Sequence, residues 1–165
     1  MISRNLLACC GVATLLMGSS ATAADDGPVK LPGGFSIALL PGFTHEPLQG
    51  IDSIVGQIVQ ADGLRIQYEM GNIPAPGALR LGGSFVNQAL QLPEQNRLWL
   101  KEQKAGGRTI LVAYGKDLRL IVSSVTAKEG INFHAEAKTP AEVADVLLMV
   151  LTLTQEQPKR GKKAP

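Results

Sequence analysis

Cysteine is nearly absent from this sequence. Its two cysteines, Cys9 and Cys10, are neighbours near the N-terminus, in a segment that we expect to be removed from the mature chain. Without them the mature protein has no disulfide framework, no thiolate nucleophile and no cysteine-ligated zinc site. The fold must therefore be stabilised by the packing of its core.

A long hydrophobic run is also absent. The longest apolar segment, residues 6–17, is shorter than the roughly 18–20 residues that span a bilayer. It follows Arg4 and leads to small residues ending at Ala23, which is the organisation of a secretory signal peptide. A lipoprotein acylated at Cys9 is the less favoured alternative, because too few residues precede that cysteine. We expect a signal peptide over 1–23, cleavage near Ala23 and a periplasmic or secreted protein.

Excess charge is missing from the body of the chain. Between residues 28 and 154 the sequence has eleven basic and eleven acidic residues, so no basic surface points to nucleic acid. Basic residues gather only in the tail, 155–165, which we expect to be disordered and able to contact an anionic membrane weakly. Residues 24–154 are long enough for a single domain with its own core.

Alternation of apolar and polar residues predicts most of the secondary structure. Residues 64–70 alternate strictly and follow the turn residues 61–63, which indicates a hairpin with residues 54–60. Similar segments, of the kind that forms half-buried strands, cover 35–39, 97–103, 108–114, 118–125 and 131–137. Residues 42–53 are expected to form a loop. The fold class is therefore α+β, an antiparallel β-sheet of about six to seven strands.

A C-terminal helix is expected to cover this sheet. Thr139, Pro140 and Glu142 have the spacing of a capping box with proline in the first turn. Apolar residues then recur at helical spacing, and further apolar positions widen the arc: Val143, Val146, Leu147 and Val150, with Ala144, Leu148 and Leu151. We expect so wide an apolar arc to be substantially buried.

One strand carries a candidate binding face. The alternation over 97–103 places Trp99 on the same face as Arg97 and Lys101. A tryptophan on a charged face can anchor a ligand or a partner protein, and the irregular segment 72–96 that precedes this strand is the kind of loop that carries binding. The alternative is that Trp99 covers the sheet beneath that segment.

Histidine is scarce as well, which limits metal chemistry. His134 and Glu136 share a strand face, and His45 and Glu46 could complete a metal site if their loop came close. The sequence does not show that it does, and solvated side chains are the favoured interpretation. A strand-to-helix serine elbow, a phosphate-binding loop and a dinucleotide fingerprint are all missing, so we expect no cofactor and no serine hydrolase.

The hairpin has a distinctive pattern of residues: Gly50-Ile51-Asp52-Ser53, Gly56, Asp62-Gly63, Ile66, Tyr68 and Gly71. It resembles a stretch found in small uncharacterised exported bacterial proteins, and the order of hairpin, meander and terminal helix is similar to PsbP-like α+β domains. That resemblance implies a non-catalytic accessory or binding protein and assigns no role to any residue.

These observations favour a non-catalytic exported binding or accessory module of the bacterial envelope, with an unknown protein or small ligand as its partner. One alternative is a small metal-assisted hydrolase that uses His45, His134 and Glu136. Another is a structural envelope protein held at the membrane by its basic tail.

Overall fold

The structure is a computed structural model that describes residues 27–50, 53–61, 63–72 and 87–156. The expected signal peptide and residues 157–165 of the basic tail lie outside this part of the chain. So do residues 73–86 of the irregular segment. Within the described residues, no helix is both long enough and apolar enough to cross a membrane.

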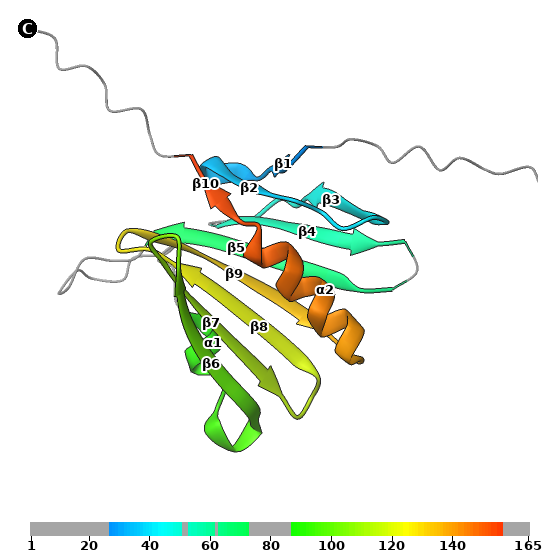
Figure 1. Cartoon of the computed structure of the whole chain (residues 1–165), viewed down its shortest axis with the longest axis vertical. Coiled ribbons are helices and arrows are strands. Elements are labelled where there is room, and N and C mark those ends of the chain that lie inside the picture. The colour runs from blue at the N-terminus through cyan, green and yellow to red at the C-terminus, as the bar shows by residue number, and fades with distance from the viewer. Residues whose placement is uncertain (1–26, 51–52, 62, 73–86, 157–165) are drawn as a thin grey trace, which may run out of the picture.

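Seven antiparallel strands form the main sheet, in the order β3-β4-β5-β9-β8-β7-β6 (Figure 1). Their bounds are β3 Phe43–Pro47, β4 Ile54–Gln60, β5 Arg65–Asn72, β6 Arg97–Ala105, β7 Arg108–Gly115, β8 Arg119–Val125 and β9 Glu129–Glu136. The central hairpin is confirmed as β4–β5 and the meander as β6 to β9. The last strand of the meander, β9, pairs with β5 and closes the sheet. The predicted α+β class is therefore correct.

In the part of the chain that the structure describes, two helices and two short 3-10 turns accompany the strands. The helices are α1 Gln88–Gln91 and α2 Pro140–Leu151, and the turns are Pro32–Gly34 and Glu94–Asn96. The N-terminus of α2 is stabilised as the sequence indicates, because the Thr139 side chain accepts from the Glu142 amide and the Glu142 carboxylate accepts from the Thr139 amide. The capping box is confirmed.

A second, small sheet joins the two ends of the described chain. It consists of β1 Val29–Lys30, β2 Phe35–Ile37 and β10 Thr154–Gln155, in the order β1-β2-β10. The expected tail boundary at residue 155 is wrong, because Gln155 pairs with Phe35 and the Glu156 amide donates to the Gly34 carbonyl. The expectation of a loop over 42–53 is wrong too, because residues 43–47 form β3 at one edge of the main sheet.

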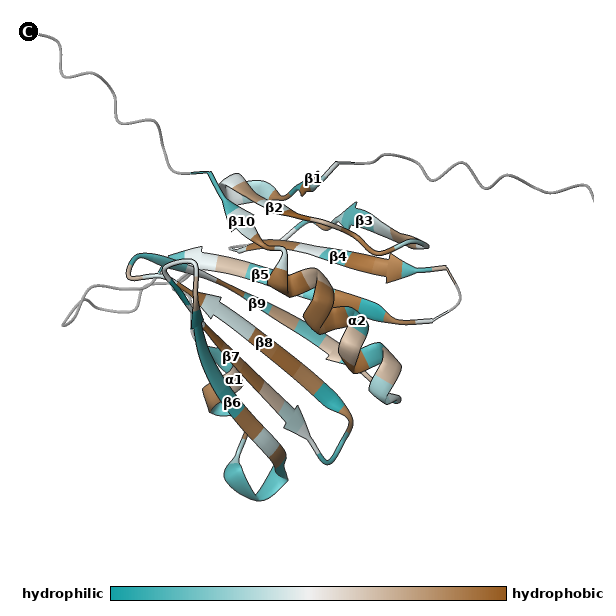
Figure 2. Ribbon diagram, in the orientation of Figure 1, coloured by the Kyte–Doolittle hydropathy of each residue, from teal (hydrophilic) through white to brown (hydrophobic). Residues whose placement is uncertain are grey.

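The main sheet has two different faces. The first, the helix face, carries the largest buried side chains of β5, β8 and β9, among them Tyr68, Leu120 and Phe133, and α2 packs on it. Figure 2 shows hydrophobic residues gathered on these strands and on α2. From α2, only Val146, Met149 and Val150 are buried. Leu148 and Leu151 are more than half exposed, so α2 is less buried than its apolar arc suggests.

The opposite face is polar over β5 and β9 and apolar under α1. There Ala89 and Leu92 pack against Leu111, Ala113 and Ile121 in a second small cluster. Polar contacts hold α1 in place, since the Ala89 amide donates to the Ser123 hydroxyl, which lies 2.6 Å from Asn132 Oδ1. The described end of the 72–96 segment therefore covers this opposite face.

Gly56 leaves space for an aromatic ring on the helix face. It lies opposite Tyr68 in the β4–β5 pairing, and a Cβ atom there would be 2.7 Å from Tyr68 Cε1 and closer still to Cζ and the hydroxyl. The Tyr68 hydroxyl lies 2.7 Å from His45 Nε2 on β3. The glycine inside this strand thus marks a close neighbour, one of the two explanations that a strand glycine suggests.

Arg108 connects the two sheets. Its guanidinium donates to the Ser124 hydroxyl and carbonyl on β8 and to Gln155 Oε1 on β10. It also lies over the Phe35 ring, 4.9 Å from the ring centre. Burial lowers the pKa of Arg108 from its usual value, and the nearby Glu129 carboxylate opposes this shift. A buried cation with these partners fixes β2 and β10 on the edge of the helix face.

Candidate functional site

A groove of about 410 Å³ lies on the helix face, between α2 and the outer strands β6 and β7. Trp99 from β6 forms part of one wall, and its ring lies 5.8 Å from the ring of Tyr114. The floor is made by Ile110, Val112 and Val122, side chains that continue the main core. Trp99 is half-buried and packs against that core, so its exposed edge faces an apolar hollow.

The α2 wall of the groove ends in an exposed leucine. Leu147, Val150 and Leu151 line this wall, and Leu151 keeps 60% of its surface exposed. On the other side the rim is polar, with the exposed side chains of Lys101, Glu102 and Gln103. Alternation along β6 places Lys101 and Gln103 on the face of Trp99 and Glu102 on the other face. An apolar floor with a lysine on the same strand face as Trp99 suits a ligand that combines an apolar body with an acidic group.

The predicted face of Trp99, Arg97 and Lys101 is only partly formed. Trp99 and Lys101 both line the groove, but Arg97 does not. The β6–β7 pairing has an irregularity between Arg97 and Trp99, so that their partners are the adjacent residues Gly115 and Tyr114. Adjacent residues of a strand point to opposite faces, and Arg97 is therefore on the opposite face from Trp99. There its Nε donates to the Leu92 carbonyl and holds the connection that follows α1.

The alternative prediction, that Trp99 lies beneath the 72–96 segment, concerns in large part residues 73–86, which lie outside the described residues. The described end of that segment packs on the opposite face through Ala89 and Leu92. Trp99 instead packs beside α2, a tertiary neighbour that no local pattern in the sequence indicates.

The proposed metal site does not form. His45 pairs with Ile58 and points to the helix face, where it contacts Tyr68, whereas His134 pairs with Gln67 and points to the opposite face. A sheet therefore separates the two imidazoles. Among the described residues, no group of three or more histidine, cysteine, aspartate or glutamate side chains is arranged to hold a metal ion.

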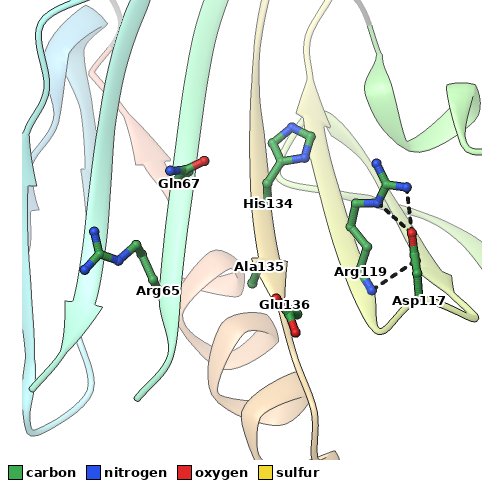
Figure 3. Close-up of a pocket in the computed structure, with 7 residues that line it drawn as sticks. All are labelled: Arg65, Gln67, Asp117, Arg119, His134, Ala135 and Glu136. Carbon is green, nitrogen blue, oxygen red and sulfur yellow. Dashed lines mark hydrogen bonds and ion pairs between the residues drawn. The ribbon is translucent and has the colours of Figure 1, made fainter. Parts of the chain in front are cut away.

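His134 and Glu136 lie instead in a polar hollow of about 480 Å³ on the opposite face (Figure 3). The side chains that surround it come from β5, β9, the first residue of β8 and the turn before it: Arg65, Gln67, Asp117, Arg119, His134 and Glu136. Most of the charges already have partners. Arg119 forms an ion pair with Asp117 at 2.6 Å, and Arg65 is directed away from His134 and donates to Gln57 Oε1.

The histidines have lowered pKa values. Burial is the main cause of the lowered pKa of His134; the Arg119 guanidinium lowers it further and the Glu69 carboxylate opposes the shift. Burial also lowers the pKa of His45 and raises the pKa of Tyr68, its hydrogen-bond partner. Since Arg65 and Arg119 are balanced in number by Asp117 and Glu136, the polar hollow has little net charge to attract an ionic ligand.

Comparison with known proteins gives information on the fold. The chain matches no protein-family profile and no curated protein sequence. The solution structure of cyanobacterial PsbP (CyanoP) from Synechocystis sp. PCC 6803 is similar, with a TM-score of 0.51 and 8% sequence identity over 74% of this chain and 87% of that one. At this identity the likeness concerns the fold, and it confirms the expected PsbP-like layout. The resemblance of the hairpin motif stays a prediction.

Proposed function

We propose that this protein is a non-catalytic binding module of the bacterial envelope, exported by its signal peptide, and that the groove between β6, β7 and α2 is its binding site. The observation that supports this most directly is the position of Trp99, the single tryptophan of the chain, at the mouth of an apolar hollow. The groove volume lies within the range of about 300–1,000 Å³ that is usual for ligand sites.

The chemistry of the groove defines the ligand class. Its floor consists of aliphatic side chains, so the ligand must offer an apolar group that gains free energy by leaving water. Lys101 at the rim favours an acidic group near that apolar body. Large aromatic side chains beside such pockets are frequent anchors of binding, because they cover much apolar surface with few rotatable bonds.

The test uses anilinonaphthalene sulfonate, which has an apolar ring system and one negative charge. Because Trp99 is the only tryptophan, quenching of its fluorescence reports binding in the groove. We expect saturable quenching by the dye. Leu151→Asp should weaken the affinity about tenfold, through loss of apolar contact worth roughly 1.4 kcal/mol and repulsion of the dye.

The matched control is Leu148→Asp. Leu148 is 54% exposed on the same helix and does not line the groove, so its substitution should leave the dye affinity unchanged. Equal effects of the two substitutions on dye affinity, or absence of quenching, would contradict the proposal that the groove is the binding site. Export has a separate test: the intact mass of material recovered from the periplasm should correspond to a chain that begins near Ala24.

A further inference from the structure

The strand β6 forms a free edge beside the groove. It is nine residues long, and β7 is its one hydrogen-bonded neighbour among the described strands. Residues 101–104 are all exposed. Every second residue of an edge strand directs its backbone N–H and C=O groups outward, and such a row is a template for another extended chain.

The other edge of the sheet is less suited to strand addition. There β3 has five residues and ends at Pro47, which has no N–H group to donate. The longer edge, β6, also has side-chain contacts to offer, because Trp99, Lys101 and Gln103 occupy alternate positions and all line the groove. An added strand would place alternate side chains over this hollow, since residues two apart in a strand share a face.

We propose that the ligand of the groove is an extended peptide segment of a partner protein, which adds to β6 as a further antiparallel or parallel strand. This inference rests on the proposed binding function of the groove. An apolar side chain of the peptide occupies the hollow beside Trp99. An acidic residue two positions away faces Lys101, whose side chain is exposed at the rim. Backbone hydrogen bonds supply affinity and the two side chains supply selectivity.

Charge favours a peptide over a second copy of this chain. If two β6 strands paired antiparallel around their centre with both α2 helices on the same side, Lys101 would face Lys101 of the other copy. Like charges directly opposite each other destabilise a strand pair. Lysine on an edge also opposes self-association in general. The same lysine attracts an acidic peptide, so one side chain serves both purposes.

The test measures fluorescence polarisation of two labelled threonine-rich peptides. One has leucine two positions before glutamate and the other has the reverse order, because the two strand directions require opposite orders. We expect one of the two to bind. Replacing its glutamate by lysine should weaken binding about tenfold, since an opposite-charge pair becomes a like-charge pair.

Backbone methylation distinguishes strand addition from simple side-chain docking. N-methylation of the alternate amides that face β6 should abolish binding, whereas methylation of the other alternate set should leave it within about twofold. On the protein, Lys101→Glu should reverse the preference so that the lysine peptide binds better. Lys104→Glu is the control, because Lys104 lies on the same strand and does not line the groove; it should not reverse the preference.

Each outcome bears on one proposal. If the dye binds and neither peptide does, the strand-addition proposal is wrong and the groove remains a binding site for small amphipathic molecules. If neither dye nor peptides bind, the proposed function itself fails. Equal effects of both methylation patterns would also overturn strand addition. So would a stable dimer in sedimentation experiments that the peptides do not dissociate, because a second copy would then occupy the edge.

Discussion

Replacing Gly56 by alanine tests the packing that the β4–β5 hairpin imposes on the core. The backbone of Gly56 does not require a positive φ, so alanine fits its conformation, and in open space the change would stabilise a strand by about 0.5–1 kcal/mol. The space is not open. A Cβ atom would be 2.7 Å from Tyr68 Cε1, and the Tyr68 ring is only 2% exposed and is bound to His45, so it cannot move away freely.

The expected result is a net loss of stability. Overpacking a well-filled core costs about 1–3 kcal/mol, and displacement of the ring also weakens the Tyr68–His45 hydrogen bond, worth about 1 kcal/mol. After the gain from alanine, Gly56→Ala should lower the free energy of unfolding by about 2 kcal/mol, or Tm by roughly 4–8 °C. Urea denaturation and calorimetry of the mature chain measure both quantities.

Two further variants show whether the loss comes from the ring. Gly63→Ala is the control in the same hairpin, because its nearest neighbour would be 3.5 Å away, and it should be neutral or slightly stabilising. In a double-mutant cycle, Tyr68→Leu should relieve part of the strain, so that the double variant is more stable than the sum of the single effects predicts. A Gly56→Ala variant as stable as the parent chain, or strictly additive effects, would refute this description of the core.

Three other predictions concern Arg108, the helix and pH. Arg108→Met should lower the free energy of unfolding by about 2–4 kcal/mol in urea denaturation, because it removes three hydrogen bonds that join the two sheets; an unchanged midpoint would contradict this role. Val146→Asp should unfold the chain or lower its stability by several kcal/mol, because Val146 is 1% exposed, whereas Leu148→Asp should be mild; circular dichroism melting distinguishes them. His45 and His134 both have pKa values below 6.5 in the folded state, so the unfolded state binds more protons below that pH. Their contribution to stability is complete above about pH 6.5 and falls as the pH drops below it. Replacing both histidines by glutamine should flatten the profile of unfolding free energy against pH between about 7.5 and 5.5. An unchanged slope would contradict the assignment of this pH dependence to the two histidines.

Local patterns in the sequence were sufficient to predict most of the longer strands and the helix α2. Strict alternation predicts β5, the spacing of Thr139 and Glu142 predicts the start of α2, and both are confirmed. What local patterns miss are pairings between distant segments. The two-residue strand β10 exists because it pairs with β2, more than a hundred residues away, and no local feature indicates it.

The candidate site could be predicted only in part, for similar reasons. Alternation correctly places Trp99 and Lys101 on one face. It assigns Arg97 to the wrong face, because no pattern in the sequence indicates the strand irregularity between Arg97 and Trp99. The failure of the metal site follows from β3, whose polar residues between glycine and proline resemble a loop. The position of His45 depends on the pairing register of β3, and the sequence does not show this register. It therefore cannot show that His45 and His134 point to opposite faces of the sheet.

The central claim is that ligands bind at the groove beside Trp99, and an amide proton–nitrogen correlation spectrum tests it most directly. The single tryptophan gives one indole signal, which marks the groove without assignment. On titration with the dye or with the binding peptide, we predict shifts of this signal and of amides in β6 and the end of α2, with β3 and the hollow around His134 unaffected. Shifts centred on His134, with the indole signal unmoved, would contradict the account.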